Sequence, residues 1–88
     1  MLAQELEKVA SAYAYRAVKL DREGRTEDAI RMYLKAIRIL EKLLELRPSL
    51  SKLYSSRLTA YKRRVRELMP EELAEIANYV AERLGPRA

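Results

Sequence analysis

The sequence contains no cysteine and no histidine among its 88 residues. Without cysteine there is no disulfide framework and no thiolate metal site. Without histidine the chain lacks the commonest general base and the commonest metal ligand, and its serines cannot form a Ser-His-Asp triad. No glycine-rich phosphate loop occurs. These absences predict a protein that is not an enzyme, binds no metal or cofactor and has no small-molecule substrate.

Long hydrophobic runs are also missing. The apolar stretches are short and are broken by Lys, Arg or Glu, whereas a membrane-spanning helix needs roughly 20 apolar residues. Met1 does not begin a signal-peptide pattern. We therefore expect an intracellular, cytoplasmic protein that meets a membrane only indirectly, through its partners.

Only two glycines and three prolines are present, and a chain rich in Ala, Leu, Glu, Lys and Arg with so few breakers is helical. Apolar residues recur at spacings of three and four, which is the period of one helical face. The periodic segments cover residues 2–23, 26–47, 50–69 and 70–84. They are separated by Gly24, Pro48 and Pro70. Thr26 and either Ser49 or Ser51 are the expected N-caps of the second and third segments.

The apolar faces predict how these segments pack. The second segment is apolar nearly all round, so it should lie between two neighbours. The first carries a row of small residues that lets a neighbouring helix approach closely: Ala3, Ala10, Ala14 and Ala17. The third carries a heptad-like seam: Tyr54, Leu58, Tyr61, Val65 and Leu68. The sequence thus predicts an all-α fold, an antiparallel three-helix bundle over residues 1–69. Residues 70–88 would form a short, fourth amphipathic helix or the start of a linker.

The net charge of +5 is concentrated in residues 48–69, which hold six basic residues and one acidic residue. The basic residues are Lys52, Arg57, Lys62, Arg63, Arg64 and Arg66. Such a helix can neutralise phosphates, which makes nucleic-acid binding the main alternative function. Two observations argue against nucleic-acid binding: the excess of basic residues does not extend to the first two segments, and the sequence contains no recognised nucleic-acid-binding motif.

One pattern spans the first turn and the third segment. Its residues are Ala17-Val18-x-x-Asp21, Gly24, Glu27-Asp28-Ala29-Ile30-x-Met32-Tyr33-x-x-Ala36-Ile37 and Tyr61-x-x-Arg64-x-x-x-Leu68. This pattern, over residues 3–69, resembles the MIT (microtubule interacting and transport) domain. Part of it also fits a tetratricopeptide repeat, but Glu41 stands where that repeat needs a proline, and no second copy exists. Asp21 lies near a helix C-terminus, where the dipole disfavours an anion, so we expect it to have a tertiary partner.

The resemblance implies a non-catalytic adaptor that binds short C-terminal peptide motifs of ESCRT-III-like filament subunits. It would recruit an AAA ATPase in membrane remodelling or cell division. Family members use either the groove between helices two and three or the groove between helices one and three. Lys62 replaces the apolar residue that supports the first mode in eukaryotic ATPase members. The resemblance therefore favours the second groove, which takes extended, proline-containing peptides.

The expected groove has one wall from the first helix and one from the third. Its predicted residues are Leu6, Ala10, Tyr13, Ala14, Tyr54, Arg57, Leu58, Tyr61 and Arg64, with Lys62 and Arg63 as rim charges. An apolar stripe at heptad spacing is more often core than binding site, and a basic run is more often a solvated face. Tyr33 and Tyr61 are therefore expected to be structural.

Overall fold

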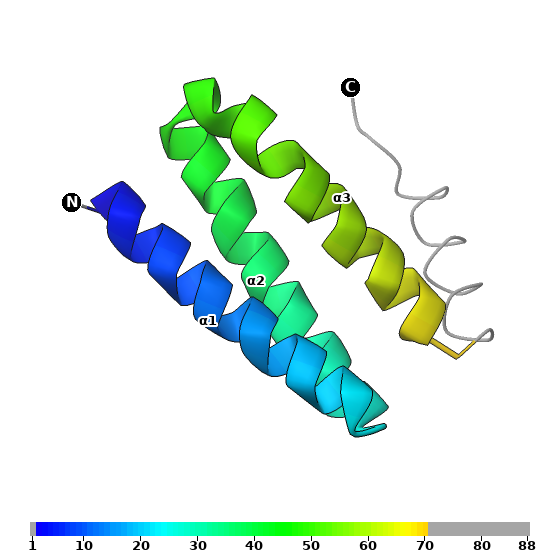
Figure 1. The fold of residues 1–88 in the computed structure, drawn as a ribbon. Helices are drawn as coiled ribbons and strands as arrows, with labels where there is room; N and C mark the ends of the chain where they lie inside the picture. The colour runs from blue at the N-terminus through cyan, green and yellow to red at the C-terminus, as the bar shows by residue number, and fades with distance from the viewer. Residues whose placement is uncertain (1, 71–88) are drawn as a thin grey trace.

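The structure is a computed structural model that describes residues 2–70 of the chain. It contains three α-helices and one 3₁₀ turn (Figure 1). These elements are α1 (Leu2–Arg22), α2 (Thr26–Leu46), η1 (Pro48–Leu50) and α3 (Ser51–Leu68). The three long helical segments predicted from the sequence are confirmed to within two residues at each end. The predicted fourth helix lies outside the described residues. None of the described helices is long and apolar enough to cross a membrane.

The two turns form where the glycine and the prolines predict them. Gly24 has a φ of 78°, in the left-handed region that glycine adopts without strain. The backbone N–H of Arg25 donates to the Leu20 carbonyl at 2.9 Å and closes the end of α1. Arg47, which precedes Pro48, is no longer helical and has a φ of −136°. The chain therefore reverses direction at two short turns, one between α1 and α2 and one between α2 and α3.

The expected N-caps are not found. Arg25 precedes α2 and Leu50 precedes α3, and neither makes a capping hydrogen bond through its side chain. Thr26 is already the first residue of α2. At the start of α3, the 3₁₀ turn begun by Pro48 takes up Ser49 and leads directly into the helix. A turn of this kind continues the helical path, so no capping side chain is required there.

Small side chains form the interface between α1 and α2. Ala17, Ala29 and Ala36 are fully buried, and helices that meet through alanine approach toward the low end of the roughly 8–10 Å interaxial range. Leu40 and Leu43 of α2 are also fully buried, and each such leucine contributes roughly 1.5–3 kcal/mol relative to its exposed state. As predicted, α2 is the middle helix and packs against both α1 and α3.

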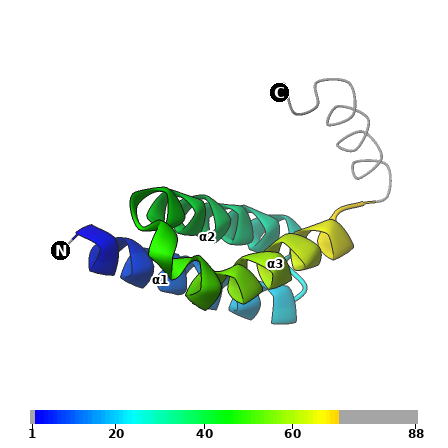
Figure 2. The same ribbon diagram turned by 90° about the horizontal axis from the view of Figure 1, so that it is seen from above.

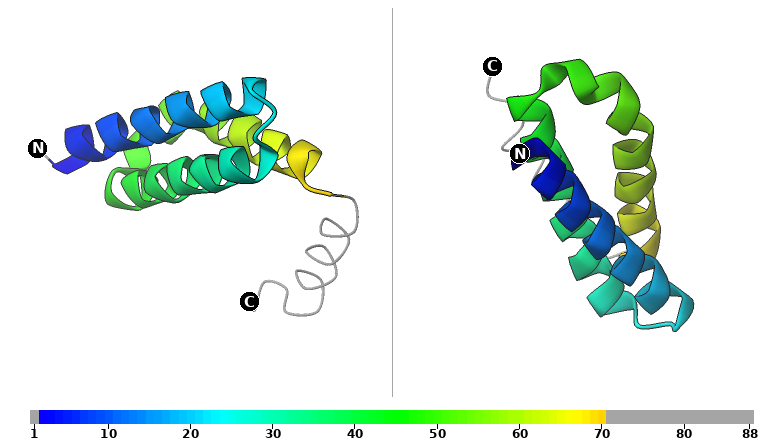
Figure 3. Two further views of the ribbon diagram at one scale, coloured as in Figure 1. Left: turned by 90° about the horizontal axis from the view of Figure 1, so that it is seen from below. Right: turned by 60° about the vertical axis from the view of Figure 1, so that its left-hand side comes forward.

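The third helix packs on α2 through its heptad-like seam. Tyr54, Leu58 and Val65 are buried, and the rings of Tyr33 and Tyr61 meet at a centroid distance of 5.9 Å. Figures 1 and 3 show α1 and α3 running in the same direction and α2 in the opposite one. Figure 2 shows α2 on one side of the bundle and α1 and α3 on the other. Close packing holds α1 to α2 and α2 to α3, whereas α1 and α3 make little direct contact.

Candidate functional site

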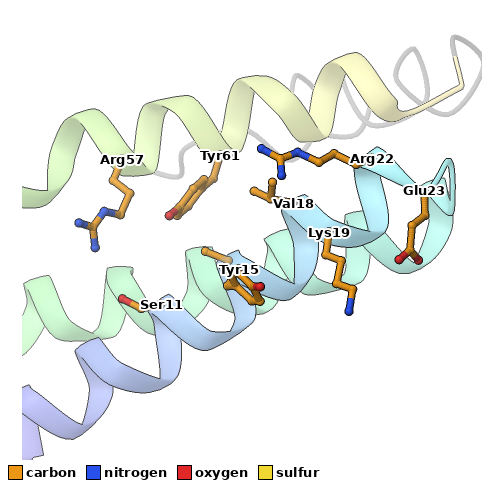
Figure 4. A pocket seen from close by; sticks show the side chains of 9 residues that line it. Ser11, Tyr15, Val18, Lys19, Arg22, Glu23, Arg57 and Tyr61 are labelled. Atoms are coloured by element: carbon orange, nitrogen blue, oxygen red, sulfur yellow. The ribbon is translucent and has the colours of Figure 1, made fainter.

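A cavity of about 640 Å³ opens between α1 and α3 (Figure 4). Ala14 and Val18 of α1 form its apolar floor, and the ring of Tyr61 comes from α3. The complete lining is Ser11, Ala14, Tyr15, Val18, Lys19, Arg22, Glu23, Arg57 and Tyr61. The cavity exists because α1 and α3 do not pack tightly against each other. The small side chains of Ser11 and Ala14 on α1 do not fill the space between α1 and the Tyr61 ring of α3.

Near the C-terminal ends of α1 and α3, a charged network joins all three helices. Arg64 of α3 donates two hydrogen bonds to the Asp21 carboxylate of α1, from Nε at 2.7 Å and from Nη2 at 2.8 Å. The Tyr33 hydroxyl of α2 donates to the same carboxylate at 3.1 Å. The side chain of Asp21 is 14% exposed and that of Arg64 is 44% exposed. The predicted tertiary partner of Asp21 is therefore a basic group.

This network changes the acidity of its members. The hydrogen bonds from Arg64 hold the pKa of the Asp21 carboxyl below its usual value, against a smaller opposing effect of burial. The pKa of Tyr33 is raised, mainly by burial and secondly by its hydrogen bond to the carboxylate. The pKa of Arg64 is raised, first by Asp21 and then by Glu67. At neutral pH, Asp21 is therefore ionised, Tyr33 is neutral and Arg64 is protonated.

A second polar contact links α1 and α3 toward their N-terminal ends. The Glu7 carboxylate of α1 raises the pKa of the Tyr54 hydroxyl on α3. The Arg57 guanidinium lies over the same ring, 5.2 Å from its centroid. The cavity adjoins both the Arg57–Tyr54 contact and the Asp21–Arg64 pair, because Arg57 and Arg22 line it.

A family model for the MIT (microtubule interacting and transport) domain matches residues 7–69. The chain belongs to the MIT domain family. The match covers most of the chain, as the residue pattern predicted, and favours this assignment over a lone tetratricopeptide repeat. MIT domains are protein-interaction modules, so the cavity is a candidate surface for a partner protein.

The curated relatives include a cell division protein. A stretch of 41 residues is 51% identical to Cell division protein C of Sulfolobus acidocaldarius. The aligned stretch is 47% of this chain and 11% of the relative, so this chain spans only a small part of the relative's length. No solved structure matches the chain significantly.

Three of the groove residues predicted from the sequence line the cavity of this MIT domain: Ala14, Arg57 and Tyr61. The others lie around it. Ala10, Tyr54 and Leu58 are buried in the core, and Leu6 packs against that core. Tyr13 lies on another side of α1, with the Lys35 ammonium of α2 5.4 Å from its ring centroid. It borders a smaller hollow of about 320 Å³ formed by α1 alone.

The predicted rim charges have different surroundings. Arg64 is engaged by Asp21 and also donates to Glu67 at 3.1 Å. Lys62 forms an ion pair of 3.0 Å with Glu41 of α2, on the side of α3 that faces α2. Arg63 is exposed and does not line the cavity. Of the predicted basic residues, Arg57 is the one that lines it.

Sequence reasoning missed most of the α1 wall. The missed residues are Ser11, Tyr15, Val18, Lys19, Arg22 and Glu23. Ser11, Tyr15, Val18 and Arg22 step by four, three and four, which places them on one helical face next to the alanine row. That spacing was the available signal. The predicted α1 residues span 6–14, whereas the α1 residues that line the cavity span 11–23, because the prediction followed the alanine row, of which Ala10 and Ala17 face the core.

The cavity has the composition of a binding surface. It offers an apolar floor, two tyrosine rings and charged groups at its edge, a combination that suits an extended polypeptide. Within residues 2–70, no group of three or more acidic, cysteine or histidine residues is placed to hold a metal ion.

Proposed function

We propose that this MIT domain is a non-catalytic module that binds a short C-terminal peptide motif of an ESCRT-III-like filament subunit in the cavity between α1 and α3. The observation that carries the proposal is the open cavity itself. α3 is fixed on α2, and α1 is fixed on α2, yet α1 and α3 stay apart over the length of the cavity. An occupant lying along the two helices would contact both of them.

The walls favour an extended peptide with proline. The space beside Ala14 and Ser11 admits side chains, and the Tyr61 ring supplies an aromatic surface of the kind on which prolines pack. Tyr15, which is 75% exposed, supplies a second aromatic ring at the cavity. An extended segment also needs less width than a helix, whose diameter with side chains is about 10–12 Å.

The opposite face of α3 is less suited to an apolar motif. There the Lys62–Glu41 ion pair crosses between α3 and α2, with both side chains about half exposed. A helical motif docking over this point would have to desolvate or replace that pair, which disfavours apolar anchoring. This supports the α1/α3 groove over the α2/α3 groove.

The similar cell division protein supports a role in division. Because the similar protein is named Cell division protein C, we propose that this domain recruits an AAA ATPase to filaments that remodel membrane during division. In this proposal the domain is cytoplasmic and reaches the membrane through its peptide partner.

Nucleic-acid binding is not supported by the charges of α3. Lys62 is paired with Glu41 and Arg64 with Asp21, so two of the six basic residues of residues 48–69 are already neutralised. With fewer unpaired cations, α3 can neutralise fewer phosphates, so its affinity for nucleic acid is lower.

A pair of serine substitutions tests the proposal. Ser11 is exposed and lines the cavity, whereas Ser56 is exposed on α3 and does not line it. We expect Ser11→Trp to fill the cavity and weaken binding of a proline-containing filament-subunit peptide by about tenfold or more, a loss of roughly 1.4 kcal/mol. Ser56→Trp, the matched control, should bind as the unmodified protein does. Titration calorimetry measures both.

Two results would contradict the proposal. One is equal peptide binding by both variants, which would place the peptide elsewhere. The other is no peptide binding at all together with salt-sensitive binding of a single-stranded oligonucleotide, which would establish the nucleic-acid alternative.

A further inference from the structure

The cavity between α1 and α3 carries an excess of positive charge. Lys19 and Arg22 of α1 and Arg57 of α3 line it, against one acidic residue, Glu23. Within residues 2–70, none of these three cations forms an ion pair. Cationic groups without a counter-ion at the edge of an apolar surface raise the local concentration of anionic ligands and favour anionic groups on the occupant.

Two of these cations face the cavity from opposite walls. In Figure 4, Arg57 descends from α3 toward α1, and Arg22 extends from the end of α1 back along the cavity toward Val18. The Tyr61 ring lies between the two guanidinium groups in this view. The contact of Arg57 with the Tyr54 ring helps to fix its direction. By contrast, Lys19 and Glu23 point away from α3.

Guanidinium groups so placed match one kind of ligand. A planar guanidinium binds a carboxylate through two parallel hydrogen bonds, and this geometry is specific as well as attractive. The surface between Arg22 and Arg57 is apolar, made by Val18 and the Tyr61 ring. The order along the cavity is therefore cation, apolar surface, cation.

Resting on the function proposed above, we infer that the groove selects an acidic peptide. An apolar or proline residue packs on Val18 and Tyr61, and carboxylates on its two sides meet Arg57 and Arg22. The same chemistry comes from two sources, an Asp or Glu side chain of the peptide or its C-terminal carboxylate. A neutral proline-rich peptide would fill the apolar part and leave both guanidinium groups unmatched.

Three labelled peptides test the inference with the 88-residue chain. They share a Leu-Pro-Leu-Pro core, end in an amide, and carry flanking Glu, Gln or Lys residues. Fluorescence anisotropy should show the Glu-flanked peptide binding about tenfold tighter than the Gln-flanked one at low salt, with the Lys-flanked peptide weakest. The advantage should shrink at high salt, because exposed charges are screened.

Variants assign the effect to the two arginines. Arg57→Gln and Arg22→Gln should each weaken the Glu-flanked peptide by about fivefold and leave the Gln-flanked peptide unchanged. Arg66→Gln is the matched control, since Arg66 is an exposed residue of α3 outside the cavity lining, and it should change neither. A Gln-flanked peptide with a free C-terminus then separates the sources: tight binding of it assigns one arginine to the terminal carboxylate, and weak binding assigns both to side-chain carboxylates.

Failure of the inference differs from failure of the proposed function. If the Gln-flanked amide binds as tightly as the Glu-flanked one, and Ser11→Trp blocks both, the carboxylate selection is overturned and the peptide-binding function stands. If none of the peptides binds, the proposed function and the inference that rests on it fall together.

Discussion

At the scale of single residues, Asp21 links α1 to both other helices through hydrogen bonds. Its carboxylate accepts two hydrogen bonds from Arg64 of α3 and one from Tyr33 of α2. The sequence predicted that this residue needs a tertiary partner, because a carboxylate at a helix C-terminus is unfavourable by itself. It did not identify Arg64, which lies 43 residues away in the sequence. The local sequence around Asp21 indicates that its carboxylate needs a partner. The identity of that partner depends on how the helices pack in the folded protein.

The network predicts a specific loss of stability. Asp21→Asn removes the charge while keeping the shape, and leaves Arg64 without its two-bond partner, so we expect a Tm lower by about 5 °C. The matched control is Asp28→Asn, because among the described residues 2–70 Asp28 pairs with Arg25 and Arg31, which are exposed and close to it in sequence. Thermal melts followed by circular dichroism compare the two. Equal melting temperatures for both variants would contradict the assigned role of Asp21.

The same carboxylate predicts a pH dependence. Arg64 holds the folded-state pKa of Asp21 below the ordinary aspartate value of about 4, so the folded protein takes up this proton less readily than the unfolded chain. The stabilisation is complete above about pH 4 and is lost as the pH falls through the lowered folded-state pKa. The difference in Tm between the unmodified protein and Asp21→Asn should therefore be constant near neutral pH and shrink below about pH 4. Melts across that range measure it, and a difference that persists unchanged in strong acid would contradict the pKa assignment.

At the scale of helices, the sequence predicted existence and packing better than the ends. The alanine row of α1 and the all-round apolar pattern of α2 indicated a close α1–α2 contact with α2 in the middle, and both are confirmed. The N-caps were wrong. Thr26 has the right chemistry for a cap, but the tight turn through Gly24 sets where α2 begins, one residue earlier than that side chain would need. The geometry of the Gly24 turn therefore determines the first residue of α2, although threonine is a favourable N-cap residue.

The close α1–α2 contact predicts sensitivity to size. Ala17 is fully buried between the helices, so Ala17→Leu forces them apart and should lower the free energy of unfolding by about 1–3 kcal/mol. Ala12 lies on the exposed face of the same helix, and Ala12→Leu should change stability by less than about 0.5 kcal/mol. Urea unfolding measures both free energies. A tolerated Ala17→Leu would show that the interface is not packed as described.

At the scale of the whole molecule, the three-helix architecture was predictable, while the position of the cavity was predictable only in part. Apolar periodicity specifies which face of each helix is covered. It does not specify how far α1 and α3 stand apart, because each is held chiefly by α2. Arg57 and Tyr61 were predicted groove residues and line the cavity; Tyr61 belongs to the α3 seam and Arg57 lies beside it. Val18 and Arg22 were missed since they lie beside the alanine row instead of within it.

The spacing of α1 and α3 also connects stability with binding. The Asp21–Arg64 pair joins the two helices near their C-terminal ends, next to the cavity residue Arg22. This pair fixes the distance between α1 and α3 at that end of the cavity before any partner binds. A preformed groove lowers the ordering cost of binding.

The central claim is that a partner peptide lies between α1 and α3. The most direct measurement is a chemical-shift titration of the isotope-labelled 88-residue protein with a proline-containing peptide from a candidate filament subunit. The account predicts that the backbone amides of Ser11, Val18, Arg57 and Tyr61 shift together in a saturable manner. Shifts confined to the α2/α3 side around Glu41 and Lys62, or no shifts at all, would contradict it.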